Sequence, residues 1–254
     1  MNLLTSFLSI FILTRSSTSI TFNCQFIDIE FCPTCIHQCK AINLIITKQN
    51  QTVTKIFTNN KESENIKVLK IHDQIVHHMP MGLENFFPYL SILQVWSCGL
   101  REITQNNIKV HENLHELSLS GNEIEILESN LFEKNLKISK IDFSRNRLKN
   151  VGFNLLLPLE NLIFADFYAN DCINDGSRNQ KFMIISNLRK FCKPTNEMLM
   201  NDIKNLNEEV KKLKTEIKIC EKFNKNHRCN EDNENIVGID SLFPFFFVND
   251  ENRI

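Results

Sequence analysis

The sequence predicts an α/β repeat protein, a solenoid of 24-residue units whose parallel strands line one concave face. Two apolar positions and one polar position recur at this interval (93 − 69 = 24). The apolar sets are Leu69, Leu93, Leu117, Ile141 and Ala165, and Ile71, Val95, Leu119, Phe143 and Phe167. The polar set is Gln74, Cys98, Asn122, Asn146 and Asn170. A unit of this size cannot bury its apolar side alone, so neighbouring units must stack.

The third unit carries the fullest form of the repeat. It reads Leu114-x-x-Leu117-x-Leu119-x-x-Asn122-x-Ile124-x-x-Leu127, the signature of a leucine-rich repeat. We expect five repeats over residues 66–171, beginning at Ile66, Leu90, Leu114, Ile138 and Leu162. In each repeat a strand leads into a turn, where the Asn side chain satisfies backbone groups that the bend leaves unpaired. Gln74 and Cys98 depart from Asn, and Cys98 is predicted to be a buried free thiol.

Composition and missing motifs exclude several classes of function. The 254-residue chain has a formal net charge of −1 and no apolar run long enough for a transmembrane helix. We therefore expect neither a nucleic-acid partner nor a membrane span. The histidines are scattered over different repeat positions, and the chain has no Gly-rich phosphate loop and no G-x-S-x-G elbow. The sequence thus predicts no enzyme, no cofactor and no metal site.

Residues 1–19 are predicted to be a secretion signal. Leu3 to Leu13 is an apolar stretch, and Ser17 and Ser19 stand at the small-residue positions of a cleavage site, so the mature chain would begin near Ile20. The alternative is a buried N-terminal strand or helix. Nine cysteines are typical of a secreted chain and favour the signal, so we expect an extracellular location.

Residues 20–65 are expected to form a cysteine-rich cap, with Cys24, Cys32, Cys35 and Cys39 near its start. A hairpin is predicted from strands over 42–47 and 52–57 joined by a turn at 48–51. In an alternative register, Ile42 and Ile45 stand 24 residues before Ile66 and Leu69. The four cysteines could also hold zinc, although a secreted chain favours disulfides. Asn50-Gln51-Thr52, in the predicted turn, is a candidate N-glycosylation site.

A second cap is expected over residues 172–194. Cys172 and Cys192 would be bridged around a short amphipathic helix over 182–188, and Pro194 stops the helical pattern. A bridge that closes a loop of about 20 residues contributes roughly 3 kcal/mol to stability.

The apolar period becomes a heptad over residues 195–223. β-Branched residues alternate with leucines along the seam, which favours a parallel two-stranded coiled coil. The seam residues are Leu199, Ile203, Leu206, Val210, Leu213, Ile217 and Cys220. The pair could be a homodimer or a heterodimer, and Cys220 and Cys229 could pair within one chain or across the dimer. The alternative is a single amphipathic helix lying on the solenoid. Residues 224–254, which include a Phe-rich run at 243–248, are expected to be disordered.

The concave strand face is the predicted binding surface, because alternate strand residues point away from the core. Trp96 and Tyr168 share the seventh position of their repeats and are the expected aromatic anchors. The other candidate partner-binding residues are Lys70, His72, Asp142, Phe164 and Asp166. The alternative is that Trp96 only packs sideways on Lys70 or His72.

The repeat, the capping cysteines and the heptad segment together resemble secreted arthropod leucine-rich-repeat proteins, especially the leucine-rich-repeat immune proteins of mosquitoes. The resemblance covers about residues 24–229 and is carried by the third repeat, by Ile138-x-x-Ile141-x-Phe143-x-x-Asn146-x-Leu148, and by Asn170-x-Cys172 with Cys192. Those immune proteins carry a paired-cysteine motif between solenoid and coil, where this chain has only Cys192.

The resemblance implies that Cys24 pairs with Cys39, which leaves Cys32 to pair with Cys35. It also implies a secreted protein that recognises another macromolecule in innate immunity. Because the same plan serves adhesion and matrix proteins, the alternative is a structural protein that uses the solenoid as a spacer.

Overall fold

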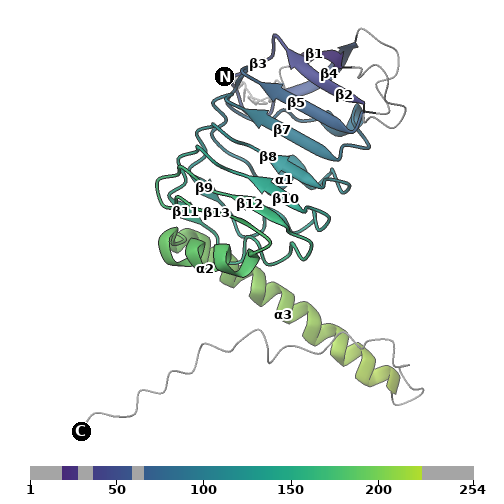
Figure 1. Cartoon of the computed structure of the whole chain (residues 1–254). Helices are drawn as coiled ribbons and strands as arrows, with labels where there is room; N and C mark the ends of the chain where they lie inside the picture. Colours follow the sequence, from purple (N-terminus) through teal and green to yellow (C-terminus); the bar gives the residue numbers. More distant parts are fainter. Residues whose placement is uncertain (1–18, 28–36, 59–65, 225–254) are drawn as a thin grey trace, which may run out of the picture. The chain divides into compact units, whose positions relative to one another are not determined.

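The computed structural model describes residues 19–27, 37–58 and 66–224. The repeats supply five parallel strands that lie side by side (Figure 1), namely β5 (Val68–His72), β7 (Ile92–Trp96), β8 (Glu116–Ser118), β10 (Lys140–Asp142) and β12 (Phe164–Asp166). Each strand is displaced by one repeat from the next, so that Leu93 lies between Leu69 and Leu117. The parallel pairing predicted from the 24-residue period is therefore confirmed.

The two recurring apolar positions form the core. Leu69, Leu93, Leu117 and Ile141 are fully buried. Aromatic rings fill the space toward the C-terminal repeats, where the Phe143 and Phe167 rings stack with their centroids 5.8 Å apart. Stacking one unit on the next buries a continuous apolar interior that no single unit could form.

The recurring polar position forms a ladder of hydrogen bonds between repeats. The Asn146 Oδ1 atom accepts from the backbone N–H of Ile124 at 3.1 Å, and its Nδ2 atom donates to the carbonyls of Leu119 and Phe143. Asn122 and Asn170 make the corresponding bonds. Buried peptide groups at each turn are thereby paired, as the sequence predicts.

Gln74 and Cys98 perform the same task with other atoms. Gln74 accepts from the N–H of Leu44 through its Oε1 atom at 2.9 Å. The Cys98 thiol is buried and free, and its Sγ atom donates to the carbonyls of Ile71 and Trp96. Burial is the main reason why the pKa of Cys98 is raised, so the thiol stays protonated and keeps this donor.

Short elements follow the main strand in each of the first four repeats. They are β6 (Ile75–Val76), the 3₁₀ helix η2 (Leu83–Asn85), α1 (Gln105–Ile108), β9 (Ile126–Leu127) and β11 (Asn150–Val151). A two-stranded parallel sheet joins β9 to β11. Leu83 and Ile108 are buried, so these segments close the core from their side.

The N-terminal cap differs from both arrangements expected from the sequence. Its strands are β1 (Ser19–Ile27), β2 (Gln38–Ile42), β3 (Ile45–Ile46) and β4 (Thr52–Thr58). Strand β3 pairs with β6 and not with β4, so the predicted hairpin is wrong. Gln38 lies beside Val68 and Ile45 beside Ile75, an offset of 30 residues (68 − 38), so the alternative 24-residue register is wrong as well.

The missing part of the prediction is β1. It lies between β2, to which it is antiparallel, and β4, to which it is parallel. Phe22 on β1 is fully buried and packs edge-on against the Phe87 ring, with 5.9 Å between the centroids. Strand β1 pairs with β4, so β4 does not pair with β3, which precedes it in the sequence.

Two of the three predicted cap disulfides lie within the described residues, and both are present. Cys24 on β1 is bonded to Cys39 on β2, with 5.4 Å between the Cα atoms. Cys172 is bonded to Cys192, with 5.1 Å between the Cα atoms. The second bridge encloses β13 (Gly176–Arg178) and α2 (Lys181–Phe191), which covers the last repeat with Ile184, Ile185 and Leu188.

Among the described residues the main sheet has nine strands, in the order β13-β12-β10-β8-β7-β5-β2-β1-β4. Strand β13 is antiparallel to β12 and ends the sheet on that side. The repeats and both caps thus share one sheet, which extends from the edge strand β4 to the edge strand β13 among the described residues.

The heptad segment is helical. Helix α3 (Asn196–Asn224) begins after Thr195, whose hydroxyl oxygen accepts from the N–H of Met198 at 3.2 Å. The chain divides into two compact units near Met200, and most of α3 belongs to the second. In the single chain the seam residues from Leu199 to Ile217 are exposed, and the predicted pairing of this helix stays a prediction. No helix in the described ranges is long and apolar enough to cross a membrane.

Several predictions fall outside the described residues. These are the secretion signal up to residue 18, the pairing of Cys32 with Cys35, the role of Cys229, and the tail from residue 225 onward.

Candidate functional site

The strands β5, β7, β8, β10 and β12 present one face that the core does not use, and we call it the open face. It is the surface predicted to be concave. Three outward positions of each repeat supply its side chains, and the strand register places equivalent positions in rows across the sheet. The seventh-position row contains His72, Trp96, Ser120, Ser144 and Tyr168. The fifth-position row contains Lys70, Gln94, Ser118, Asp142 and Asp166.

Trp96 is held on both sides. Its ring stacks on that of His72, with 4.3 Å between centroids and 5° between planes. Its indole N–H donates to the Ser118 hydroxyl, with 2.6 Å between Nε1 and Oγ. The sideways packing on His72 considered from the sequence is therefore present, yet Trp96 remains 36% exposed. A fixed ring with an open edge loses little conformational freedom when it binds.

Asp142 is the centre of a hydrogen-bond network that reaches Trp96. Its Oδ2 atom accepts from the Ser118 hydroxyl at 3.0 Å. Its Oδ1 atom accepts from the backbone N–H of Ser144 at 2.9 Å and from the Ser144 hydroxyl at 2.6 Å. The Ser120 and Ser144 hydroxyl oxygens are 2.9 Å apart, and because the Ser144 proton points to Asp142, Ser120 is the donor. The network therefore fixes the carboxylate and the indole together.

The other predicted aromatic lies apart from this network. Tyr168 follows β12, three strands from Trp96, a separation of about 14 Å at the usual spacing. Its side chain is 55% exposed, and its backbone N–H donates to the Asp166 Oδ1 atom at 2.8 Å. Phe164 on the same strand is half-buried. The structure thus brings His72, Trp96 and Asp142 together and leaves Tyr168, Phe164 and Asp166 as a second group.

His72 is neutral near pH 7. Burial is the main reason why its pKa lies below the usual 6.5, and the positive charges of Lys70 and Lys40 lower the pKa further, against the opposing effect of Asp73. Its Nε2 atom is buried and has no hydrogen-bond partner among the described residues. An uncharged imidazole can lie flat against the indole without the cost of burying a cation.

Sequence reasoning missed the serines of the open face. Ser118 is 3% exposed, and it is the residue that joins Trp96 to Asp142. The available signal was the run of small polar residues at the fifth and seventh positions of the central repeats, Ser118, Ser120 and Ser144. Small hydroxyl side chains between an indole and a carboxylate predict a relay of hydrogen bonds.

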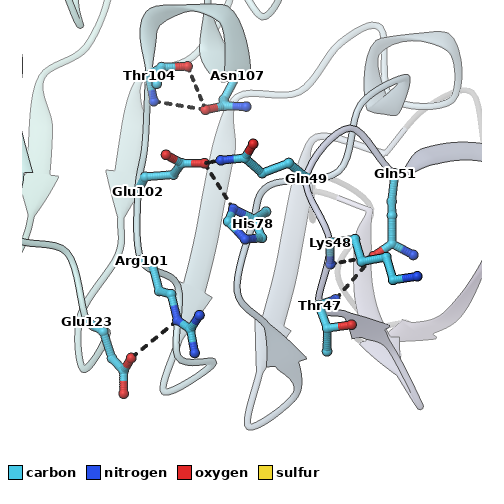
Figure 2. Close-up of polar contacts among 10 residues, drawn as sticks. All are labelled: Thr47, Lys48, Gln49, Gln51, His78, Arg101, Glu102, Thr104, Asn107 and Glu123. Carbon is cyan, nitrogen blue, oxygen red and sulfur yellow. Dashed lines mark hydrogen bonds and ion pairs between the residues drawn. The ribbon is translucent and has the colours of Figure 1, made fainter. Parts of the chain in front are cut away.

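A groove of about 440 Å³ lies beside the cap turn and the first two repeats. Figure 2 shows the Gln49 and His78 side chains pointing toward the Glu102 carboxylate, whose Oε1 atom is 2.9 Å from both Gln49 Nε2 and His78 Nδ1. The Gln51 side chain closes the turn by accepting from the N–H groups of Thr47 and Lys48. Asn50, the glycosylation candidate, is exposed in this turn and lines the groove.

Among the described residues no group of three His, Cys, Asp or Glu side chains could hold a metal ion. The open face offers fixed hydrogen-bond acceptors, the exposed aromatic rings of Trp96 and Tyr168, and both signs of charge. Such a surface is suited to holding another molecule in one orientation.

Comparisons with known proteins give limited similarity. No family model and no curated protein matches the chain. One similar solved structure is the LRIM1/APL1C complex, with 16% identity and a TM-score of 0.43 over 58% of this chain and 31% of that one. Another is the TLR13–ssRNA13 complex, with 21% identity and a TM-score of 0.35 over 48% of this chain and 18% of that one.

The chain thus spans less than a third of the length of either solved chain. The assignment to a leucine-rich-repeat fold therefore rests on this chain's own features. These are the 24-residue period, the one-repeat strand register and the ladder of asparagine side chains.

Proposed function

We propose that this chain is a secreted, non-enzymatic recognition protein that binds another protein through its open face, in innate immunity. The observation that carries the proposal is the network from Trp96 through Ser118 to Asp142. It holds an exposed aromatic ring and a carboxylate in one geometry without neutralising the carboxylate. Rigid aromatic anchors of this kind dominate the affinity of protein interfaces.

Two disulfides among the described residues support an oxidising, extracellular location. The glycosylation site at Asn50 belongs to the same proposal, since its side chain is exposed in a turn. Secretion from a eukaryotic cell should add a glycan to Asn50. Mass spectrometry should find it on the wild-type chain and not on Asn50→Gln, and an unmodified wild-type chain would contradict this part.

The heptad helix α3 makes the protein a dimer in this proposal. A lone helix of this length is marginal in water and needs its apolar seam covered. Ile203, Val210 and Ile217 alternate with leucines, which favours a parallel pair. Light scattering should give a dimeric mass for the full chain and a monomeric mass for residues 20–195. A monomeric mass for the full chain at micromolar concentration would rule out self-pairing, and a heterodimer would then require a co-purified second chain.

Binding itself is tested in native extracellular fluid. A photo-crosslinker at Ser120, which follows Trp96 in the seventh-position row, should capture a protein that the same crosslinker does not capture at Lys134, an exposed residue outside the strands of the open face. Addition of Trp96→Ala to the Ser120 crosslinker chain should abolish the capture. The same proteins recovered from both positions would contradict the proposal.

The rival function is a structural or adhesive protein that uses the repeats as a spacer. The stacking of Trp96 on His72 is the observation that favours this function, because a Trp96 ring packed in this way could serve only to stabilise the sheet. In that case the chain should remain in insoluble matrix when Trp96 and Tyr168 are both replaced by Ala. Loss of matrix retention in that variant would exclude the spacer function.

A further inference from the structure

The fifth-position row of the open face, extended onto β2, carries opposite charges at its two ends. Lys40 on β2 lies beside Lys70 on β5, so this end is cationic. The next two strands carry the uncharged Gln94 and Ser118. The following two, β10 and β12, carry Asp142 and Asp166 side by side. The row therefore runs from a pair of lysines to a pair of aspartates, and Trp96 lies beside its middle in the seventh-position row.

Among the described residues no ion pair neutralises the lysines or the aspartates of this row. No lysine or arginine in the described ranges lies within 4.0 Å of the Asp142 or Asp166 carboxylate, and the ion pairs found there involve other residues. In the neighbouring third-position row, by contrast, Glu116 and Lys140 are 4.0 Å apart and compensate each other. The positive charges of Lys40 and Lys70 also lower the pKa of His72, whose ring stacks on Trp96.

The acidic end is left uncovered by its neighbour. Gly176 on β13 lies opposite Asp166, and a Cβ atom at Gly176 would come within 3.1 Å of the Asp166 Oδ1 atom. The only cation on β13, Arg178, lies opposite Phe164 instead. Asp142 is fixed by its serine partners, so its position is set before any ligand arrives. Charges that are fixed but uncompensated select a partner of complementary charge.

The distance between the lysines and the aspartates sets the length of ligand that can reach both groups. Strand β5 is three strands from β10 and four from β12, about 14 and 19 Å at the usual interstrand distance. An extended chain advances about 3.3 Å per residue. The two charged side chains of an extended ligand would therefore be about four to six residues apart.

We infer that the open face binds an extended polypeptide segment that crosses the strands, with an acidic side chain at Lys40 and Lys70 and a basic side chain at Asp142 and Asp166. An apolar or planar group between them covers Trp96. This inference rests on the proposed function and adds the charge order of the partner to it.

The test uses a random peptide library displayed on phage and panned against the full chain, with panning against Trp96→Ala as the comparison. Peptides enriched only on the wild-type chain should contain an acidic and a basic residue four to six positions apart. An enriched peptide is then synthesised without tryptophan. Because Trp96 is the single tryptophan of the chain, its fluorescence reports the binding of this synthetic peptide.

Charge variants then test each end with that peptide. Lys40→Glu with Lys70→Glu, and separately Asp166→Asn, should each weaken binding by about tenfold, since close charge pairs across an interface are coupled. The double lysine variant should regain affinity for a peptide whose acidic residue is replaced by Lys. Lys109→Glu, an exposed lysine on α1's C-terminal side, is the matched control and should leave the affinity unchanged.

The outcomes separate the inference from the proposed function. Peptides that require Trp96 but tolerate both charge changes would overturn the charge order and leave the open face as a binding surface. A library that yields no peptide dependent on Trp96 would count against the open face as a peptide-binding surface and against the inference with it. Capture by the Ser120 crosslinker would still decide whether a folded protein binds there.

Discussion

Trp96 and Tyr168 occupy the same position in two repeats, yet their surroundings differ. Trp96 has an aromatic ring, His72, on the preceding strand and the Ser118 hydroxyl on the following one. Tyr168 follows the strand beside β13, which offers Gly176 opposite Asp166, and its side chain is 55% exposed. The repeat fixes where an aromatic stands, while the neighbouring repeats decide whether it is held in place.

The comparison also separates two sources of order on one face. The Trp96 region depends on side-chain hydrogen bonds that converge on Asp142. The Tyr168 region depends on the C-terminal cap, whose disulfide, strand β13 and helix α2 lie against the last repeat. Changes to the two regions should therefore have distinguishable effects.

The largest effect should come from the C-terminal bridge. Cys172→Ala with Cys192→Ala removes a cross-link between residues 20 apart and should lower the free energy of unfolding by about 3 kcal/mol. Hydrogen exchange should rise first in β12, β13 and α2, while Trp96 fluorescence in native buffer stays unchanged. A change at Trp96 as large as that at β12 would show that the two regions are not independent.

Asp142→Ala should have the next largest effect. It removes the acceptor of three hydrogen bonds, two from hydroxyls and one from a backbone N–H, and should destabilise the fold by about 2 kcal/mol in urea unfolding. Asp166→Ala is the matched control at the same repeat position. It loses one backbone hydrogen bond and should cost about 1 kcal/mol or less. Equal losses would contradict the role of Asp142 as the centre of a network.

Ser118→Ala should remove the hydrogen bond to the Trp96 indole without changing the packing of the core. Because Trp96 is partly exposed, its freed N–H should bind water, so we expect a loss of about 1 kcal/mol and a red shift of the tryptophan emission. Ser120→Ala removes a hydroxyl that is hydrogen-bonded to Ser144, whereas the indole N–H donates to Ser118, so this variant should leave the emission unchanged. An unshifted emission in Ser118→Ala would contradict the hydrogen bond between the Trp96 indole and Ser118.

Acidification should act on the Trp96 region through His72. The folded-state pKa of His72 lies below 6.5, so the folded chain binds fewer protons than the unfolded chain, and stability is lost as the pH falls below about 6.5. His111 is 3% exposed, and its pKa is also lowered by burial, so it contributes in the same direction. Protonation of His72 should quench the fluorescence of the stacked Trp96 ring at low pH. This quenching should disappear in His72→Gln and persist in His111→Gln.

The repeat fold could be predicted because each unit repeats the same physical requirement. Leu93 and Leu117 are buried for the same reason, and Asn122 and Asn146 pair the same backbone groups. The cap could not be predicted in this way, because its strands pair once only and at an offset of 30 residues. The alternation of Ile20, Phe22 and Cys24 indicates strand β1. It is not used in the prediction, because the adjacent secretion-signal pattern places the start of the mature chain near Ile20.

The open face could be predicted only as positions. The outward placement of Trp96 and Asp142 follows from strand alternation. Their connection does not, since it needs the Ser118 hydroxyl of the strand between them to accept from one and donate to the other. Interactions between three strands are not visible in a pattern that treats one repeat at a time.

The most direct test of the account is the affinity of the open face for its partner. The protein captured by the Ser120 crosslinker would be titrated into the wild-type chain and into the double variant Trp96→Ala, Tyr168→Ala, with correct folding of both chains checked by circular dichroism. A central anchor is worth about 2 kcal/mol or more, so the double variant should bind about thirtyfold more weakly or worse. An unchanged dissociation constant would contradict the claim that this face carries recognition.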